Sequence, residues 1–212
     1  MKSKIEQYRL SYNLSPIDKK LFIFTVAFFL VLFATAQTSL DRFNQERLDL
    51  NQKGMLVLGS WALANIISSP IFAGRSSGSI RAFHQMNGYW NSVNLVIAGF
   101  GYYNAFKGEA NGLSLAESIL EQQSIEKILL FNAGLDLAYI TGGFYLRERA
   151  KRGVKNESRL NGFGNALLLQ GGFLFAFDLV FYLVQRGHAS VLFEHIEGIT
   201  FHSNGLGLIW RI

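Results

Sequence analysis

The sequence has 212 residues, of which half are hydrophobic and only 17% are charged, with 19 Phe and a net charge of +5. The charged fraction is well below the quarter that is usual for a soluble domain, and the length suits one or two domains. Cysteine is absent, which excludes a disulfide framework, a thiol nucleophile and a thiolate metal site. We attribute the basic excess to membrane topology and expect no nucleic-acid partner, because the basic residues cluster at particular helix ends.

The N-terminal region, residues 1–36, has the three parts of a secretory signal. Two lysines precede an uninterrupted apolar run from Leu21 to Ala36, which ends in Ala34-Thr35-Ala36. A basic flank, a short apolar core and a small-x-small end are the features of such signals. The polar stretch before the run is long for a signal. Residues 1–36 are therefore expected to be either a cleaved signal peptide or an uncleaved signal anchor, and either one directs the chain out of a bacterial cytoplasm.

Four later stretches, each of about 20 residues, have the length that a hydrocarbon core of roughly 30 Å requires. They are residues 55–73, 86–106, 128–146 and 166–185. The second stretch is the least apolar, because it contains four Asn residues. A soluble helical bundle is the alternative, but a soluble surface helix has a polar face, whereas these stretches are apolar nearly all round.

The connections between these stretches differ in charge. Residues 74–85 carry two Arg and no acid, and residues 147–160 carry six Lys and Arg, whereas residues 107–127 carry four Glu against two Lys. Cytoplasmic loops of membrane proteins are enriched in Lys and Arg. We therefore expect a bacterial inner-membrane protein whose N-terminus is cytoplasmic and whose C-terminus is periplasmic.

A motif recurs at an offset of 74 residues and predicts an internal duplication. The pattern apolar-Asn-Gly-aromatic-x-Asn occurs as Met86–Asn91 and again as Leu160–Asn165. Its fixed positions are Asn87, Gly88 and Asn91 in the first copy, and Asn161, Gly162 and Asn165 in the second. At the same offset Asn104 aligns with Asp178. The alternative is chance similarity between apolar segments, although Asn and Gly residues in this order are unusual in a membrane span.

The predicted fold is an all-α membrane protein, a four-helix transmembrane bundle built from two tandem helical-hairpin repeats. Each repeat opens with a short amphipathic helix on the outer surface, and Ser114 and Glu117 have the spacing of a capping box in the second. Asn204-Gly205 between two apolar runs predicts a short C-terminal β-hairpin. The expected parts are the signal segment 1–36, the first repeat 37–106, the second repeat 107–186 and a periplasmic tail 187–212.

Polar residues inside the predicted spans are the candidate functional residues, because hydrocarbon offers them no partners other than protein groups. Asp136 and Asp178 are expected on neighbouring antiparallel helices, both roughly 12–13 Å below the outer boundary at about 1.5 Å per residue. Two carboxylates that close would share a proton or bind a cation. The alternative is that such groups only hydrogen-bond across helices and fix the bundle. Further candidates for this polar lining are Asn132, Gln170, Asn65 and Asn94.

Soluble-type catalysis and metal binding have little support in the sequence. His188, His195 and His202 recur every seven residues, but Gly198 and the predicted hairpin break any common helical face, so no metal site is expected. The sequence has no nucleophile beside a base and no phosphate-loop, dinucleotide or haem-attachment motif. We therefore expect no catalytic residue and no cofactor.

Several runs resemble an uncharacterised family of small, signal-bearing, polytopic helical membrane proteins from Gram-negative bacteria. These runs are Phe43–Arg47, Asn51–Met55, Gly59–Asn65 and Met86–Asn91. The resemblance covers roughly residues 38 to 212. That family has no assigned activity, so the resemblance implies a fold and a location only.

Three functions fit this sequence. The leading hypothesis is a non-enzymatic structural or complex-forming component, whose partners are the lipid bilayer and other membrane or periplasmic proteins. The alternative is a small transporter or an ion- or proton-coupled protein with Asp136 and Asp178 as its working carboxylates, and a weaker one is a lipid-acting membrane enzyme. These functions differ in one structural feature, namely whether the two carboxylates line one water-reachable cavity.

Overall fold

The computed structural model describes the backbone of residues 16–196, 199–202 and 205–208, and side chains at residues 20, 22–28 and 37–192. The elements follow in the order α1 (Pro16–Gly74), α2 (Gly78–Lys107), α3 (Leu115–Ala150), α4 (Glu157–Ile196), β1 (Ile199–His202) and β2 (Gly205–Leu208). The chain divides into two compact units, residues 1–39 and residues 40–212. The helical part of the second unit, residues 40–196, is called the helical body below.

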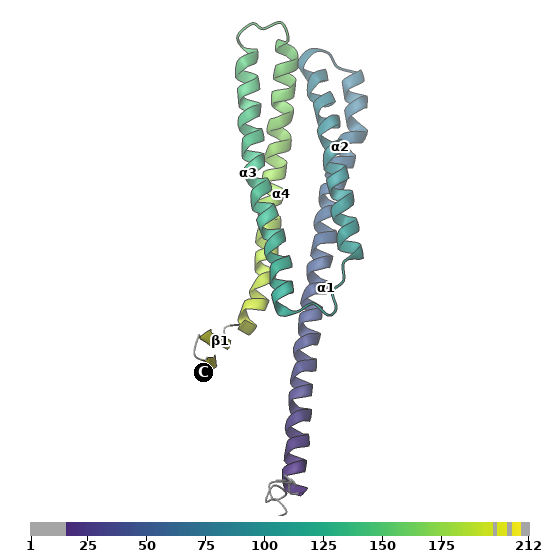
Figure 1. Cartoon of the computed structure of the whole chain (residues 1–212). Helices are drawn as coiled ribbons and strands as arrows, with labels where there is room; N and C mark the ends of the chain where they lie inside the picture. The colour runs from purple at the N-terminus through teal and green to yellow at the C-terminus, as the bar shows by residue number, and fades with distance from the viewer. Residues whose placement is uncertain (1–15, 197–198, 203–204, 209–212) are drawn as a thin grey trace, which may run out of the picture. The chain divides into compact units, whose positions relative to one another are not determined.

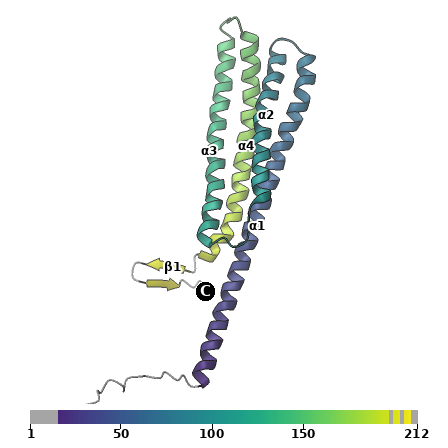
Figure 2. The same ribbon diagram turned by 45° about the vertical axis from the view of Figure 1, so that its right-hand side comes forward.

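The four helices of the helical body lie alongside one another (Figures 1 and 2). The α1–α2 turn and the α3–α4 turn, residues 75–77 and 151–156, are at the same end, which we call the basic end. The α2–α3 connection, residues 108–114, is at the other end, which we call the loop end. Helix α4 packs against both α3 and α2, so it occupies the centre of the arrangement.

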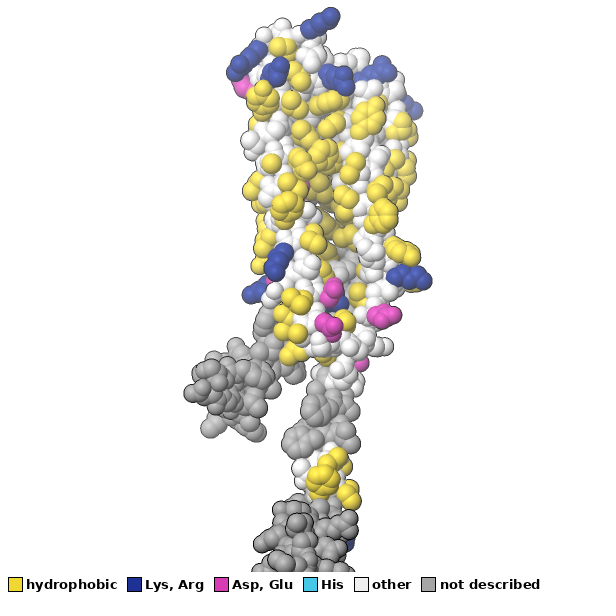
Figure 3. Space-filling model, viewed as in Figure 1, with side chains coloured by type: hydrophobic (Ala, Val, Ile, Leu, Met, Phe, Trp, Pro, Cys, Tyr) yellow, Lys and Arg dark blue, Asp and Glu magenta, His cyan; other side chains and the backbone are white. Residues whose placement is uncertain are grey.

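Polar side chains are buried in the helical body and large apolar side chains are exposed. The largest side chains that are fully buried are polar, namely Gln122, Gln170, Gln185, Asn44, Asn91 and Ser118. A belt of hydrophobic side chains covers the middle of the visible face (Figure 3), and Phe100 and Phe131 are 68% and 67% exposed. A soluble protein buries its large apolar residues, whereas a protein surrounded by lipid turns its polar residues inward.

Among the residues that the structure describes, three helical segments are long and apolar enough to cross a membrane: Gln37–Gly74, Leu115–Ala150 and Glu157–Leu192. Helix α2 does not reach the same hydropathy, because it carries the four Asn residues noted in the sequence. Three of them, Asn87, Asn91 and Asn94, are buried, so the face that α2 exposes is nevertheless apolar. The hydropathy of three helices and the inverted burial together make this an all-helical, membrane-associated body.

The predicted capping box at the start of α3 is present. The Ser114 hydroxyl accepts a hydrogen bond from the Glu117 backbone N–H at 3.3 Å, and the Glu117 carboxylate accepts one from the Ser114 backbone N–H at 2.8 Å. The amphipathic segments before the spans do not form separate surface helices, because α1 and α3 run through them without interruption. The polar face of the α3 segment instead finds partners on other helices, as Ser118 does with Asn44 at 2.8 Å.

Glycine allows α3 and α4 to approach closely near the basic end. A Cβ atom on Gly143 of α3 would lie 2.8 Å from the Gly164 carbonyl oxygen, and a Cβ on Gly164 would lie 2.7 Å from that of Gly143. Gly162 of α4 allows a similarly close approach to α2, because a Cβ atom on Gly162 would lie 2.6 Å from the Ala82 Cβ. These approaches explain how α4 can pack against two helices at once.

Helix α4 extends to Ile196, beyond Gly187 where the tail was expected to begin. The extension packs on the helical body, since Ala189 and Leu192 are buried and the His188 ring stacks on Phe43 with centroids 4.2 Å apart. After it, β1 and β2 pair antiparallel, from Ile199 opposite Leu208 to His202 opposite Gly205. The turn of this pair, residues 203–204, and the side chains of the two C-terminal histidines of the heptad series lie outside the described residues.

Candidate functional site

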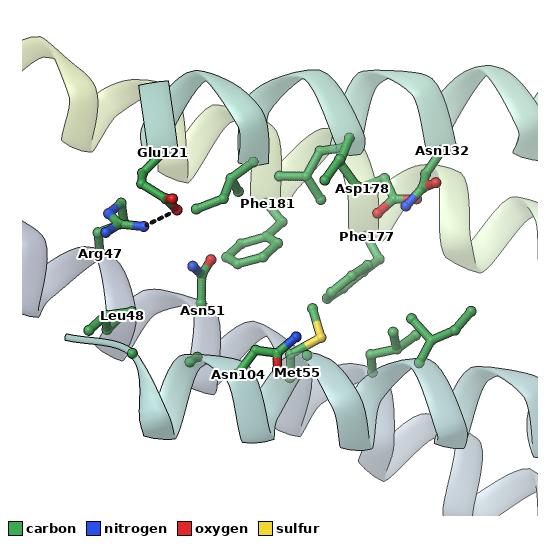
Figure 4. Close-up of a pocket in the computed structure, with 18 of the residues that line it drawn as sticks. Arg47, Leu48, Asn51, Met55, Asn104, Glu121, Asn132, Phe177, Asp178 and Phe181 are labelled. Carbon is green, nitrogen blue, oxygen red and sulfur yellow. Dashed lines mark hydrogen bonds and ion pairs between the residues drawn. The ribbon is translucent and has the colours of Figure 1, made fainter. Parts of the chain in front are cut away.

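A cavity of about 570 Å³ lies between all four helices at the loop end (Figure 4). Charged residues line its mouth: Arg47, Glu109 and Glu121. Its walls are mostly apolar, with Met55, Phe177 and Phe181 among them, and Asp178 and Asn132 lie together at the end away from Arg47. The cavity is therefore amphipathic, with a polar entrance, an apolar middle and a polar deep end.

A second cavity of about 230 Å³ continues from this deep end. The two cavities share five lining residues: Leu58, Ile97, Asn132, Phe177 and Asp178. The smaller cavity adds Asp136 and Asn94 as polar lining and Trp90 and Tyr139 as aromatic lining. We call the two cavities together the cleft, and the smaller one its inner part.

Asp136 of α3 and Asp178 of α4 form a carboxyl pair in the inner part of the cleft. They are 3% and 6% exposed, and their side chains lie within hydrogen-bonding reach of each other. Two carboxyl groups can be hydrogen-bonded to each other only if one of them carries a proton. Asp136 Oδ2 is buried and has no hydrogen-bond partner among the described amide, hydroxyl and basic groups. Both carboxyl groups therefore line one cavity, which is the structural part of the feature that separates the three functions.

The mouth of the cleft holds a buried arginine. Arg47 of α1 is 3% exposed, and its Nη1 atom donates to a Glu121 carboxylate oxygen at 3.3 Å. Its Nη2 atom donates to the Asn44 side-chain oxygen at 3.5 Å, whereas its Nε atom has no partner among the described residues. The positive charge of Arg47 is therefore matched locally by Glu121 and does not reach the carboxyl pair at the other end of the cleft.

Gln170, which the sequence groups with the candidate polar lining, belongs to a different network. Its Oε1 atom accepts a hydrogen bond from Trp61 Nε1 at 2.9 Å, and its Nε2 atom donates to Asn87 Oδ1 at 3.1 Å. Gln170 is fully buried and joins α1, α2 and α4. Asn65 likewise donates to the Trp61 backbone carbonyl at 2.9 Å. Neither residue lines the cleft. Gln170 joins three helices, Asn65 bonds within α1, and Asn94, Asn132, Asp136 and Asp178 form the site.

The residues of the repeated motif pack helices and do not line the cleft. Asn91 donates to the Asn87 carbonyl at 2.9 Å and accepts from Asn94 at 3.4 Å, which forms a buried polar string along α2. A Cβ atom on Gly88 would lie 3.1 Å from the Ser69 Cβ of α1. In the second copy Gly162 is buried against α2, while Asn161 and Asn165 are half-buried on α4.

A buried network near the loop end was not predicted from the sequence. Gln122 of α3 donates to the Gln185 carbonyl at 2.9 Å and to Glu126 at 3.1 Å, and Gln185 donates to Asn51 of α1 at 2.8 Å. Glu126 also pairs with Arg186 at 3.2 Å. The available signal was the spacing of Ser118, Gln122 and Glu126, which recur every four residues and so share one helical face. The charge pattern instead predicts that residues 107–127 are an external connection that contains a short amphipathic surface helix.

Among the residues that the structure describes, no group of three or more His, Asp or Glu side chains could hold a metal ion. A family model described as a family of unknown function, DUF6992, matches residues 57–179, more than half of the chain. Comparisons with curated proteins and with solved structures gave no match. The matched region contains the repeated motif and most of the cleft, including its carboxyl pair. The chain therefore belongs to the family of unknown function DUF6992.

Proposed function

We propose that this protein is a small, non-enzymatic membrane protein whose cleft admits a solute from the loop end to the Asp136–Asp178 pair, as a small transporter or proton-coupled binding protein does. The observation that carries this proposal is that both carboxyl groups line one cavity and lie within hydrogen-bonding reach of each other. A proton held between two carboxyl groups can be exchanged with water through the cleft. Intramembrane acidic residues with such access are typical of proton and ion pathways.

A buried pair of carboxyl groups is a costly way to hold two helices together, and this cost argues against a purely structural role. Gln170 uses both its oxygen and its nitrogen in hydrogen bonds to other helices. Asp136 Oδ2 is buried without a described amide, hydroxyl or basic donor, as Gln122 Oε1 also is. A buried acceptor without a donor costs free energy, on the order of 1–3 kcal/mol for a neutral group and more for a charged one. Leucine at these two positions would avoid this cost, and we therefore assign the carboxyl groups a functional role.

A lipid-acting enzyme is disfavoured by the composition of the cleft. None of the described residues that line it is Ser, Thr, His or Lys, and hydrolysis of an ester or a phosphodiester requires an activated nucleophile. The carboxyl pair could activate a water molecule, but no Lys or Arg among the described residues lines the inner part to bind the phosphate of a lipid headgroup. The two carboxyl groups of the cleft are suited to exchanging a proton or binding an ion.

We place the protein in a bacterial inner membrane, with the basic end in the cytoplasm and the loop end in the periplasm. Lys and Arg side chains gather at the basic end (Figure 3), as the positive-inside rule requires of a cytoplasmic face. The cleft would then open outward. The division of the chain after Ser39 supports a separate role for residues 1–36 as a signal peptide or signal anchor. Phe22, Ile23 and Phe24 of that segment are exposed.

We also propose that the membrane part is a four-helix transmembrane bundle made of two tandem hairpin repeats. Two cross-helix contacts support the duplication: Asn44 bonds Ser118, and Arg47 bonds Glu121. Each pair is separated by 74 residues, which is the offset of the repeated motif. Where two repeats are related by a two-fold axis, equivalent residues close to the axis contact each other. The two contacts therefore fit two parallel repeats related by an axis along the membrane normal.

Labelling with dicyclohexylcarbodiimide tests the proposed function. This apolar reagent adds to protonated carboxyl groups, so purified protein should gain one adduct on either Asp136 or Asp178, located by peptide mass spectrometry. Glu126 is the internal control, because it is also buried but is paired with Arg186, and it should stay unlabelled. The Asp136→Asn, Asp178→Asn double variant should gain no adduct. Folded wild-type protein that remains unlabelled at both aspartates would refute a protonated pair in an accessible cleft.

A further inference from the structure

We infer that the cleft binds a monovalent organic cation with an apolar or aromatic body, of the quaternary ammonium, phosphonium or lipophilic amine class. The cation would lie in the inner part of the cleft, with its charge at the Asp136–Asp178 pair. This inference rests on the proposed function and adds the class of ligand. It follows from three properties of the inner part: its net charge, its aromatic walls and its size.

The first property is an uncompensated negative charge. A carboxyl pair that shares one proton has a net charge of −1, and no Lys, Arg or His lines the inner part among the described residues. Arg47, the basic residue of the cleft, is already paired with Glu121 at the mouth. A buried charge without a partner is costly. Either a second proton or one monovalent cation would neutralise the pair.

The second property is the aromatic lining. Trp90 of α2, Tyr139 of α3 and Phe177 of α4 line the inner part from three helices. The Trp90 and Tyr139 rings pack edge to face with centroids 4.6 Å apart, so they form a continuous wall. Aromatic faces attract cations, by about 2 kcal/mol or more where water is excluded, and this is how proteins recognise quaternary ammonium groups. The remaining walls are aliphatic and would contact the apolar body of the ligand.

The third property is the size of the inner part, which together with its charge excludes other ligand classes. A bare metal ion would leave most of the space of about 230 Å³ unfilled, and among the described residues no group of three or more His, Asp or Glu side chains could hold one. An anion would be repelled by the pair. A neutral solute would leave the negative charge without a partner.

Because a second proton and the cation neutralise the same pair, they compete for it. From α1 and α2 the inner part receives no titratable side chain, from α3 it receives Asp136 and Tyr139, and from α4 it receives Asp178. The other charged groups of the cleft, Arg47, Glu109 and Glu121, are at the mouth. Competition by one proton lowers the apparent affinity for the cation as the pH falls, by up to about tenfold per pH unit.

The test uses two ions of the same shape and opposite charge, tetraphenylphosphonium and tetraphenylborate, on the full-length protein in detergent. Each is added before dicyclohexylcarbodiimide, and the adduct on the aspartate pair is quantified by mass spectrometry. We expect tetraphenylphosphonium to reduce the labelling at least fivefold, and tetraphenylborate at the same concentration to leave it unchanged. The protection should weaken when the pH is lowered.

The outcomes separate this inference from the proposed function. Labelling that only the phosphonium ion prevents supports a cation site. Labelling that neither ion prevents, or that both prevent equally, overturns the cation inference and leaves an accessible, protonated pair. Absence of labelling overturns the proposed function itself. The Trp90→Leu variant provides a second readout, because it keeps both carboxyl groups and should still be labelled, yet phosphonium should protect it less than the wild type.

Discussion

Replacing Gly143 with valine is expected to prevent α3 and α4 from packing together. A Cβ atom at this position would lie 2.8 Å from the Gly164 carbonyl oxygen and 2.9 Å from the Leu168 Cγ atom, and neither the backbone nor the adjacent helix can move away without losing other contacts. Overpacking of this kind costs about 1–3 kcal/mol in well-packed cores, and here the clash involves backbone. We expect a loss of at least about 3 kcal/mol, measured as a lower midpoint of unfolding in a titration with a denaturing detergent.

The preceding residue is the matched control for this prediction. A Cβ atom on Gly142 would meet nothing within 4 Å, although Gly142 and Gly143 lie in the same turn of α3 and have the same intrinsic helix propensity. Gly142→Val should therefore change the midpoint little, since substitutions away from packed features cost about 0.5 kcal/mol or less. Equal effects of the two valine variants would show that the α3–α4 crossing is not as close as described.

Replacing Gln170 with leucine is expected to have the second-largest effect on stability. The change leaves the Trp61 Nε1–H and the Asn87 Oδ1 atoms without their partner at the junction of α1, α2 and α4. Unpaired buried groups cost about 1–3 kcal/mol each in soluble proteins. Hydrogen bonds between membrane helices are weaker, about 0.6 kcal/mol on average and up to about 1.7. We expect a total loss of about 2 kcal/mol, measured by the same detergent titration.

A double-mutant cycle checks the cause of this loss. Trp61→Phe removes the indole donor, so Gln170→Leu should cost less in that background than in the wild type. Ser92→Ala is the control background, because the Ser92 hydroxyl is exposed and bonds the Gly88 carbonyl of its own helix. In this background Gln170→Leu should cost as much as in the wild type. Strict additivity of the Trp61 and Gln170 changes would mean that the hydrogen bond between them contributes nothing to stability.

Depth in the membrane could be predicted from the sequence, whereas rotation about a helix axis could not. Counting residues from the ends of two apolar stretches places Asp136 and Asp178 at the same level. Whether they face each other depends on how α3 and α4 are rotated, and this rotation depends on contacts between the two helices, such as that of Gly143 with Gly164. The pairing of the two carboxyl groups is therefore a result of the structure, although the sequence identified both members.

For Gln170, sequence spacing predicts the wrong neighbours. Its spacing of eight residues from Asp178 suggests a common polar slot, but two helical turns are enough to change its neighbours from the cleft to Trp61 and Asn87. Similarly, nothing near Gln122 in the sequence indicates that Gln185 is its partner. Local signals such as the Ser114–Glu117 capping box were predictable because both partners lie within one turn.

The absence of cysteine in the chain permits the most direct test of the central claim, which is that water from the loop end reaches the carboxyl pair. Asn132, next to Asp178 in the cleft, is replaced by cysteine, and a membrane-impermeant cationic thiol reagent is added to intact spheroplasts. Phe131→Cys is the matched control, because Phe131 is at the same depth but is exposed on the outside of the helical body. We predict rapid modification of Cys at position 132 and none at position 131. If neither cysteine reacts in folded protein, or if both react at the same rate, the cleft does not connect the periplasm to Asp136 and Asp178.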